Sequence, residues 1–512
     1  MKTCAALHHG EFESNGVAHS FGAPSEVRWG DSVLPGRKHS RWHHDLSFFI
    51  FAIPLIADDP ERGLATTATM LCALESQLAD DASELQRFHW SPIAIATRIL
   101  ALTSALALLA KDVLAANAGE VQTIGSHIWR CVAMLETTVE RYLGYNHAAT
   151  TEAGLAVGLI LLGRHQDAQS SGVKLVQVLD VSTTTDGMWS ERSPSYHICM
   201  LVLADGGKEL FQAGSMESRR LHQLTQLMRS ALSAVVHPDG EIAIFNDSAI
   251  ADSPAPGSVG WSRETATNNL VLPVGGYARL ARGGITVIFD AGPMGPDSVI
   301  GHGHADFLSI EVSVGDTRLI VDPGVASISG DDDRRWTRSA ASHNGPRVAG
   351  AEPAEFFGTW RVGRRGSARF TAMSEDLNEG SDTSTFVSGE CNGYSHLGVG
   401  VSRKVTVTDH GELHIEDRWT GVDAFEPATS FLVPLAWSVE EHRSTRLVMS
   451  HADGAAVELS VAGGRVADVV ASRYFPEGPM GGYGATCVHL APTDHALVTT
   501  IRTMGRTPSV TA

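Results

Sequence analysis

The stretch GHGHADFLSIEVSVGDTRLIVDPG, residues 301–324, tells most about the fold. Its second half alternates apolar and polar residues on both sides of a glycine turn, which is typical of two short β-strands. It opens with His302, His304 and Asp306 at alternate positions. Because alternate side chains of a strand share one face, the segment predicts two imidazoles and a carboxylate on the same face of a strand.

The spacing of apolar residues changes near residue 271. After it, segments such as GYARLARGGITVIFDAG and the hairpin RKVTVTDHGELHIEDRW, with DHG as its turn, have the period of two that indicates β-strands. Before it, segments such as SPIAIATRILALTSALALLAKDVLAA have helical spacing. We therefore expect a multidomain α+β chain: a loosely ordered leader at 1–44, a helical bundle, solenoid or toroid at 45–270, and an antiparallel β-sandwich at 271–512.

Composition narrows the class of protein. The 512 residues carry a formal net charge of −19 and are 43% hydrophobic, which predicts a globular chain that repels nucleic acid and anionic membranes. The six scattered cysteines are typical of reduced thiols. No signal peptide and no apolar run of membrane-spanning length is visible. We expect a soluble, cytoplasmic protein; periplasmic location or secretion by another route stays open.

Two segments of the helical half carry candidate polar residues. RYLGYNHAATTEAGLAVGLILLG places Asn146 and His147 directly before an apolar helix, which an Asn N-cap with an incidental histidine also explains. DGMWSERSPSYHICML places Tyr196 in the first turn of a helix that begins at Pro194. The polar residues around it, Arg192 among them, need partners or a ligand if they are buried. A tyrosine transfers protons only with help from a neighbouring cation or hydrogen-bond donors.

A third group of residues has the composition of a metal site. His304, Asp322 and His343 are two imidazoles and a carboxylate, which form a usual ligand set for zinc. The three are widely spaced in sequence, and we expect them to converge only if adjacent strands bring them together. Three polar residues at strand ends, without a ligand, explain the same pattern.

Taken in order, five segments resemble the heparinase II/III family of polysaccharide lyases. They are NHAATTEAGL, DGMWSERSPSYH, HPDGEIAIFNDS, GHGHADFLSIEVSVGDTRLIVDPG and RSAASHNGPRVAG, and the resemblance spans about residues 85–485. It implies an N-terminal incomplete (α/α) toroid, a C-terminal antiparallel β-sandwich and a substrate cleft between them. It also implies β-elimination at a uronic acid of an anionic polysaccharide or oligosaccharide, which leaves a 4,5-unsaturated sugar.

The resemblance assigns catalytic roles to four residues. Asn146, with His147, is expected to bind the substrate carboxylate, which must be neutralised before the weakly acidic C5 proton can leave. Tyr196 is expected to donate a proton to the departing O4. Either Tyr196 or His302 then removes the C5 proton, depending on the stereochemistry of the uronate.

The resemblance also implies a structural metal ion held by His304, Asp322 and His343. Zinc suits this set better than calcium, which prefers oxygen ligands. Asp306 is expected to orient one of the imidazoles through its other nitrogen. No organic cofactor is implied.

Substrate contacts are expected from three arginines and a tryptophan. Arg192, Arg338 and Arg347 suit sugar carboxylates or sulfates, because a guanidinium makes paired hydrogen bonds to such groups. Ordinary salt bridges explain each arginine equally well. Trp189 stands where the family often has a histidine, so it bears on the identity of the substrate.

Three other functions fit the same residues. A uronate C5-epimerase abstracts the same proton and returns it to the opposite face. A carbohydrate-binding protein would keep the fold without turnover. A glycoside hydrolase would need a pair of acidic residues, for which Asp186, Glu191 and Asp247 are candidates.

Overall fold

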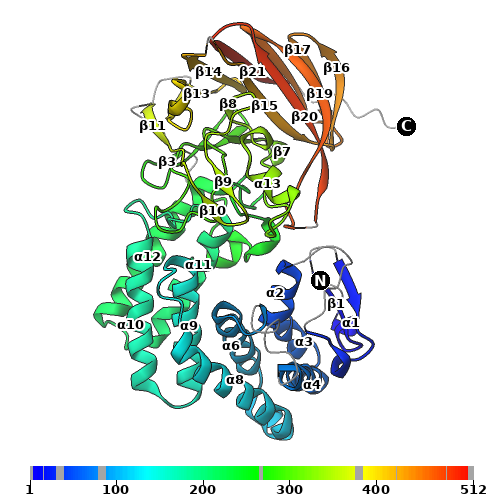
Figure 1. Cartoon of the computed structure of the whole chain (residues 1–512), viewed down its shortest axis with the longest axis vertical. Helices are drawn as coiled ribbons and strands as arrows, with labels where there is room; N and C mark the ends of the chain where they lie inside the picture. Colours follow the sequence, from blue (N-terminus) through cyan, green and yellow to red (C-terminus); the bar gives the residue numbers. More distant parts are fainter. Residues whose placement is uncertain are drawn as a thin grey trace. The chain divides into compact units, whose positions relative to one another are not determined.

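Figure 1 shows the computed structural model of the chain, which describes residues 4–14, 17–29, 40–78, 88–264, 269–374, 384–422, 424–479 and 481–504. The chain divides into two compact units. The helical unit is Met1–Ser182 with Val202–Leu224, and the β-rich unit is Thr183–Leu201 with Thr225–Ala512. The chain therefore changes units after Ser182, inside α11 (Pro194–Gly207) and inside α12 (Met216–Leu232), and not at residue 271 as the sequence suggests.

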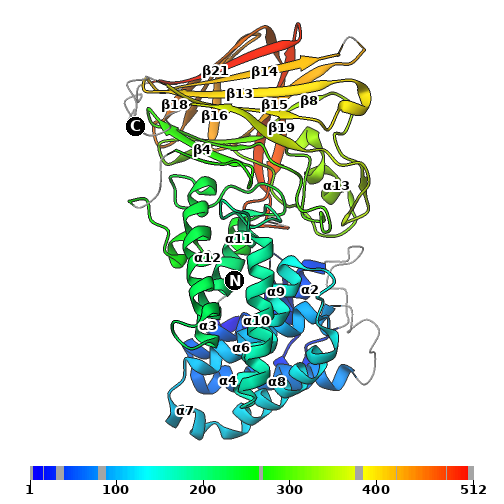
Figure 2. The same ribbon diagram turned by 90° about the vertical axis from the view of Figure 1, so that its left-hand side faces the viewer.

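The helical unit is built from amphipathic helices that bury their apolar stripes against one another. Helix α9 packs on α6, α8 and α10, and Figure 2 shows α9 and α10 side by side. The start of α6 at Pro92 fits a proline in the first helical turn, where no amide donor is needed. The helices are α1 (Cys4–Leu7), α2 (Ser40–Phe48), α3 (Ala52–Asp58), α4 (Pro60–Leu78), α6 (Pro92–Ala107), α7 (Lys111–Ala116), α8 (Ala118–Thr138), α9 (Tyr145–Leu161) and α10 (His165–Ser182).

Part of the predicted leader is ordered structure. Residues 4–14 and 17–29 form α1 and a hairpin of β1 (Glu11–Ser14) and β2 (Val17–Ser20). Phe12 and Trp29 are buried in the core of the helical unit. The expectation of a loose leader is wrong for these two ranges, because their apolar side chains complete that core; residues 30–39 lie outside the described ranges.

The β-rich unit consists mainly of three antiparallel sheets. A five-stranded meander has the order β3-β4-β5-β6-β7, an eight-stranded sheet β11-β12-β13-β14-β21-β18-β17-β16, and a four-stranded sheet β19-β20-β15-β8. The strands are β3 (Leu270–Leu272), β4 (Tyr277–Arg282), β5 (Ile285–Asp290), β6 (Ile310–Val314), β7 (Thr317–Ile320), β8 (Pro346–Val348), β11 (Ala368–Met373), β12 (Ser384–Cys391), β13 (Gly400–Thr408), β14 (Glu412–Thr420), β15 (Pro427–Pro434), β16 (Trp437–Arg443), β17 (Arg446–His451), β18 (Ala456–Ala462), β19 (Gly464–Tyr474), β20 (Tyr483–Pro492) and β21 (Ala496–Met504).

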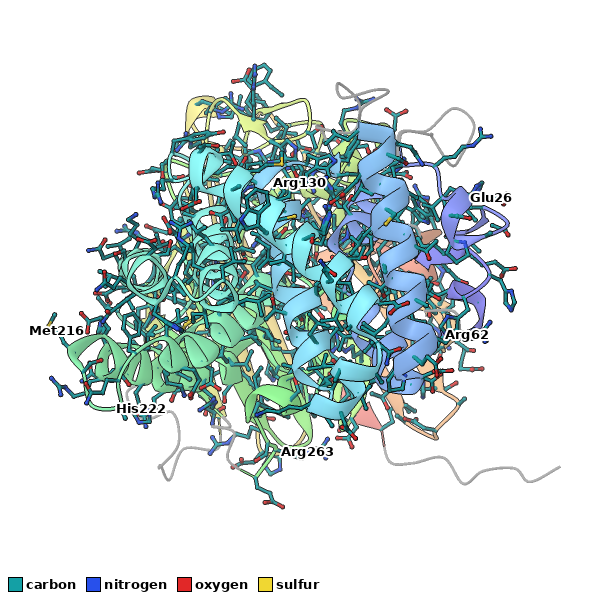
Figure 3. All side chains as sticks on the ribbon, turned by 90° about the horizontal axis from the view of Figure 1, so that it is seen from below. Glu26, Arg62, Arg130, Met216, His222 and Arg263 are labelled. Carbon is teal, nitrogen blue, oxygen red and sulfur yellow. The ribbon has the colours of Figure 1, made fainter. Side chains whose placement is uncertain are left out.

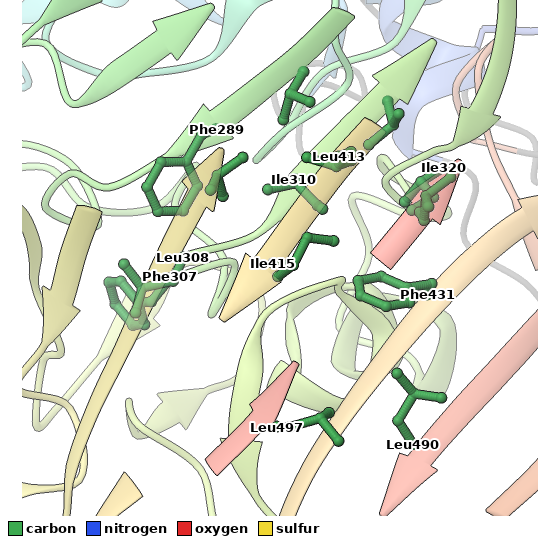
Figure 4. Packing of buried hydrophobic residues seen from close by; sticks show 14 of the residues in the cluster. Phe289, Phe307, Leu308, Ile310, Ile320, Leu413, Ile415, Phe431, Leu490 and Leu497 are labelled. Carbon is green, nitrogen blue, oxygen red and sulfur yellow. The ribbon is translucent and has the colours of Figure 1, made fainter. Parts of the chain in front are cut away.

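Alternating side chains fill one core between these sheets. The predicted hairpin is β13–β14, in which Val405 pairs with Ile415 and Val407 with Leu413, all fully buried. Figure 4 shows Leu413 and Ile415 gathered with Phe431 and other apolar residues of the same cluster. A helical region followed by antiparallel sheets confirms the expected fold class.

The surface of the helical unit carries both charged and apolar side chains. Met216 and His222 project outward from α12, and Arg62 and Arg130 lie at the surface of α4 and α8 (Figure 3). Among the described residues, none of the helices combines the length and apolarity that crossing a bilayer requires. None of the six cysteines, all in described ranges, forms a disulfide.

Candidate active site

Tyr196 and His302 lie against each other in the β-rich unit. Helix α11 begins at Pro194, as the sequence predicts, and Tyr196 is in its first turn, with its amide 3.3 Å from Oγ of Ser193. The ring centroids of Tyr196 and His302 are 4.4 Å apart, and the rings are tilted by 39°. A phenol and an imidazole this close to each other can both act on one bound substrate.

The two histidines do not lie on a strand. Residues 301–309 form a loop with turns, and β6 begins only at Ile310. Leu308 has φ +60°, in the left-handed region that an extended strand does not use. The expectation that strand alternation brings His302 and His304 to one face is therefore wrong.

A single carboxylate brings the two imidazoles together instead. Nδ1 of His302 lies 3.0 Å from Oδ2 of Asp247, and Nε2 of His304 lies 2.8 Å from Oδ1 of the same residue. Arg334 also contacts both oxygens, with Nη2 2.9 Å from Oδ2. Asp247 is 5% exposed, and Arg334 is fully buried.

The charge of Asp247 fixes the protons of both histidines. Burial alone would raise the pKa of this carboxyl, but the charge of Arg334 and the hydrogen bonds from His302 and His304 hold it well below its usual range. An ionised carboxylate only accepts hydrogen bonds, so Nδ1 of His302 and Nε2 of His304 donate to it. When His302 is neutral, its lone pair is therefore at Nε2. Burial lowers the pKa of His304 to about 3, so that ring is neutral.

Asp306, the third polar residue of the opening motif, does not orient an imidazole. Its Oδ2 accepts a hydrogen bond from the amide of Asn246 at 3.0 Å. Oδ1 of Asn246 in turn accepts from the amide of His304 at 2.9 Å. Burial and the charge of Asp290 raise the pKa of Asp306. Asp306 and Asn246 therefore join two loop segments by backbone hydrogen bonds, in place of the predicted role for Asp306.

Two further side chains border His302. Its Nε2 lies 3.7 Å from Oε1 of Glu191, whose Oε2 accepts from the indole of Trp189 at 2.7 Å. Trp360 meets the imidazole edge-to-face, with ring centroids 5.6 Å apart. The side chain of His302 is 12% exposed, so a substrate reaches it at one open edge.

Two of the residues predicted to contact the substrate are buried and form hydrogen bonds inside the protein. Arg192 donates to Asp290 at 2.6 Å, to the carbonyl of Gly275 at 2.9 Å and to that of Pro293. Trp189 is fully buried, and its amide donates to Nδ1 of His197. The prediction that Arg192 and Trp189 contact the substrate disagrees with this burial, since both side chains use their donors inside the protein.

The other two predicted arginines also have partners in the protein. Arg338 is 1% exposed and donates to the carbonyls of Gly303 and Thr359, so it holds the loop that carries His302. Arg347 is partly buried and donates to the hydroxyl of Ser430 at 2.9 Å. For Arg338, a supporting role replaces the predicted sugar contact.

Asn146 and His147 belong to the helical unit. Both lie in the first turn of α9, whose N-cap residue is Gly144, so Asn146 does not cap the helix. The side chain of Asn146 is buried, with 6% of the residue exposed. Nδ1 of His147 lies 2.7 Å from Oε2 of Glu140.

The predicted metal ligands form pairs in the β-rich unit. Nδ1 of His343 lies 2.8 Å from Oδ2 of Asp322, and the rings of His304 and His343 have centroids 5.5 Å apart. Nδ1 of His304 and Nε2 of His343 are buried and have no hydrogen-bond partner. Within the described ranges, no group of three or more His, Cys, Asp or Glu side chains is arranged to hold a metal ion. The two bare imidazole nitrogens have the chemistry of metal donors, while Asp322 is engaged by His343.

Sequence reasoning underrated three residues of this site. Asp247 lies in the segment HPDGEIAIFNDS, and the sequence suggests it only as a candidate acid for hydrolysis. Arg334 and Trp360 fall in DDDRRWTR and EFFGTWRV, where nothing in the spacing of residues marks a site. Only the folded chain brings all three to His302.

The geometry described above supports one kind of chemistry. His302, oriented by an ionised carboxylate, can take up a proton at Nε2, and Tyr196 beside it can donate or accept one. Proton transfer at a substrate bound against both rings needs no further group from this unit.

Comparisons with known proteins show which domain family and which fold the chain is similar to. Residues 265–477 match the family model "Heparinase II/III-like, C-terminal". A crystal structure of heparinase III aligns over 98% of this chain and 84% of its own, with a TM-score of 0.74 and 14% identity. The heparan sulfate lyase HepC from Pedobacter heparinus aligns over 98% of this chain and 83% of its own, with a TM-score of 0.58 and 14% identity.

A named relative is similar in sequence over part of its length. FtsZ-localized protein C from Caulobacter vibrioides is 25% identical over 360 residues, which are 66% of this chain and 58% of the relative. The match thus spans less than two thirds of that protein. Residues 265–477 thus match the heparinase II/III-like C-terminal domain, and the chain has a fold similar to that of heparinase III.

Proposed function

We propose that this chain is a lyase that cleaves a uronic-acid-containing anionic glycan by β-elimination. The observation that carries the proposal is the contact between Tyr196 and His302, with His302 oriented by Asp247. The heparinase III fold supports a polysaccharide substrate. The product would be a 4,5-unsaturated uronate at the new non-reducing end.

The proposed reaction consists of proton transfers by His302 and Tyr196. Nε2 of His302, with its lone pair free, removes the C5 proton, and Tyr196 donates its phenolic proton to the departing O4. If the stereochemistry of the uronate presents the C5 proton to the other side, Tyr196 first passes its phenolic proton to Nε2 of His302. The phenolate then takes the C5 proton and delivers it to the departing O4. The electron pair of the C5–H bond forms the C4–C5 double bond, and the O4–C4 bond breaks. Asn146, with His147, is proposed to bind the substrate carboxylate and stabilise the enolate-like intermediate.

Two of the three candidate acids are poorly suited to catalyse hydrolysis. A glycosidase needs one protonated carboxylic acid as a proton donor. Asp247 is held ionised by Arg334. Asp186 accepts hydrogen bonds from the amides of Val274 and Gly275. Neither of these two carboxyls is set up as a general acid. The third candidate, Glu191, accepts a hydrogen bond from the indole of Trp189 at 2.7 Å.

A uronate C5-epimerase remains the alternative reaction at the same residues. It shares the proton abstraction by His302 or Tyr196 and differs only in the fate of O4. Elimination yields a conjugated product that absorbs ultraviolet light, whereas epimerisation does not. Product analysis separates the two.

A second candidate function rests on the named relative. The similarity to FtsZ-localized protein C favours a protein that is localised by FtsZ, with or without catalysis. Co-sedimentation with polymerised FtsZ tests it: pelleting above the level of a bovine albumin control supports the candidate, and pelleting at that level speaks against it.

The test of the lyase proposal is ultraviolet absorbance during incubation with uronic-acid glycans. Heparan sulfate, chondroitin sulfate, hyaluronan and alginate are assayed with the wild type, His302→Gln and the control His222→Gln, an exposed residue of α12. We expect absorbance to rise on at least one glycan with wild type and control, and not with His302→Gln. If wild type binds glycans without any rise, the lyase proposal fails.

A further inference from the structure

A short hairpin brings an aromatic side chain to the candidate active site. Strands β9 (Phe356–Phe357) and β10 (Arg361–Val362) pair antiparallel, and the turn between them contains Thr359 and Trp360. Helix α13 (Asp332–Arg338) fixes this turn, because Arg334 Nε and Arg338 Nη1 both donate to the carbonyl of Thr359, at 3.3 and 2.9 Å. The same two arginines hold Asp247 and the carbonyl of Gly303, so one short helix ties the hairpin to the His302 loop.

Three neighbours fix the indole of Trp360. The Cζ atom of Arg334 lies over one face of the ring, 4.9 Å from its centroid. His302 meets it edge-to-face, with an interplanar angle of 75°. Gly301 passes so close that an added Cβ would come within 3.3 Å of the ring atom Cε3. These contacts restrict the position of the ring, and a side chain at residue 301 would crowd it.

Trp360 is nevertheless 45% exposed, although several other tryptophans are almost completely buried. Because Arg334 lies over one face, the opposite face and the outer edge are the parts of the indole that a ligand could cover. An aromatic surface that is exposed and held in place beside His302 and Tyr196 is available to contact a ligand bound there. The surroundings are polar, with His302, Asp247 and Glu191 within the same site, so the ligand has an apolar patch next to polar groups.

We infer that Trp360 is a stacking platform for a sugar ring of the glycan bound at His302. A pyranose ring presents C–H groups on one face and hydroxyls around its edge, which matches a bare indole face next to hydrogen-bonding side chains. The inference rests on the proposed function and extends it by naming a contact that determines specificity. The sequence predicts such a contact at Trp189, but that side chain is buried. Stacking recognises the apolar face of the ring, so this contact selects for ring shape and not for sulfate or carboxylate charge.

The inference is tested by enzyme kinetics and by direct binding. The variants are Trp360→Ala, Trp360→Phe, and Trp129→Ala as a control, because Trp129 is 59% exposed on α8 of the helical unit. KM and kcat are measured on whichever glycan the wild type cleaves. Binding of heparan sulfate, chondroitin sulfate, hyaluronan and alginate oligosaccharides is measured by calorimetry at low and high salt, and thermal unfolding confirms that each variant is folded.

We expect Trp360→Ala to raise KM and the oligosaccharide Kd by about tenfold or more, with a smaller change in kcat. Trp360→Phe, which keeps an aromatic face, should recover most of the loss, and Trp129→Ala should behave as wild type. The ratio of variant to wild-type Kd should be the same at both salt concentrations, because stacking is not screened by ions.

Two results would overturn the inference. If folded Trp360→Ala keeps the wild-type Kd and KM, or loses kcat alone, the indole only supports His302. Failure of the wild type to bind any of the four oligosaccharides also contradicts it. A wild type that binds but does not cleave, with binding weakened in Trp360→Ala, would sink the lyase proposal and leave the stacking platform supported.

Discussion

Arg334 and Asp247 form a buried two-pronged ion pair, with Nη2 of the arginine 2.9 Å from Oδ2 of the carboxylate. Both side chains are almost completely excluded from solvent. This pair keeps Asp247 ionised, and the ionised carboxylate orients His302 through its Nδ1 proton. The acid–base chemistry proposed for His302 thus depends on Arg334, for which we propose no contact with the substrate.

Replacing Asp247 with asparagine should impair both catalysis and stability. The amide cannot balance Arg334, and it does not fix Nδ1 of His302 as the donor. We expect the lyase rate to fall by about a hundredfold or more, and the free energy of unfolding by about 3 to 5 kcal/mol. Rates and urea unfolding are compared with Asp332→Asn, an exposed residue of α13. Wild-type rates in Asp247→Asn would refute this role.

Arg192 is expected to affect stability and not substrate binding. Burial would lower the pKa of its guanidinium, but the charge of Asp290 raises it, so the two form a buried pair. Arg192→Ala leaves Asp290 uncompensated and should cost about 3 to 5 kcal/mol of unfolding free energy. Arg192→Lys should recover only part, because one ammonium cannot also reach the carbonyls of Gly275 and Pro293. A raised KM with unchanged stability would instead favour a sugar contact.

We propose that the bare nitrogens of His304 and His343 bind a divalent metal ion, with zinc as the best match to imidazole donors. Purified protein should contain about one zinc per chain. A strong chelator should lower the temperature of unfolding, and His343→Ala should abolish both the zinc content and the effect of the chelator. The proposal is wrong if the purified protein contains no metal and the chelator does not change its unfolding temperature.

His197 should make the β-rich unit less stable in mild acid. Burial lowers its pKa to about 4 from an ordinary value of 6.5, and it stays neutral between the amide of Trp189 and the carbonyl of Met228. Below pH 6.5 the unfolded chain takes up a proton that the folded chain does not. The free energy of unfolding is therefore highest above pH 6.5 and falls toward pH 4, by up to about 3 kcal/mol for this residue.

Urea unfolding between pH 7 and pH 4.5 measures this effect. His197→Gln should show a shallower fall with pH than the wild type, while His222→Gln, at the surface of α12, should match the wild type. Equal slopes in His197→Gln and wild type would mean that another histidine, such as the partly buried His44 with its pKa lowered to about 4, dominates the pH dependence.

The fold class could be predicted from the sequence, and so could the local elements on which some candidate site residues lie. The alternation around Val405 and Ile415 predicts their pairing, because side-chain period and turn residues are local properties. The start of α11 at Pro194 follows from the same kind of local signal. The sequence did not reveal that His302 and His304 share Asp247, because a loop with a left-handed residue at Leu308 replaces the expected strand.

Burial is the property that sequence reasoning misjudged. Arg192, Trp189 and Arg338 have the right chemistry for a sugar, but the folded chain uses their donors internally. Trp360, which no motif marks, is left exposed at the site. Exposure depends on contacts between residues far apart in the sequence, and local patterns do not encode it.

The most direct test of the central claim is the initial rate of ultraviolet absorbance increase with Tyr196→Phe, on the glycan that wild type cleaves best. This change removes one oxygen atom from the ring that lies 4.4 Å from His302. Tyr483→Phe, whose hydroxyl donates to Glu477 at 2.6 Å, is the matched control. We predict that Tyr196→Phe is folded, binds the glycan and has lost at least about a hundredfold in rate, while the control keeps wild-type activity. Wild-type activity in Tyr196→Phe would contradict proton transfer by Tyr196 and with it the proposed mechanism.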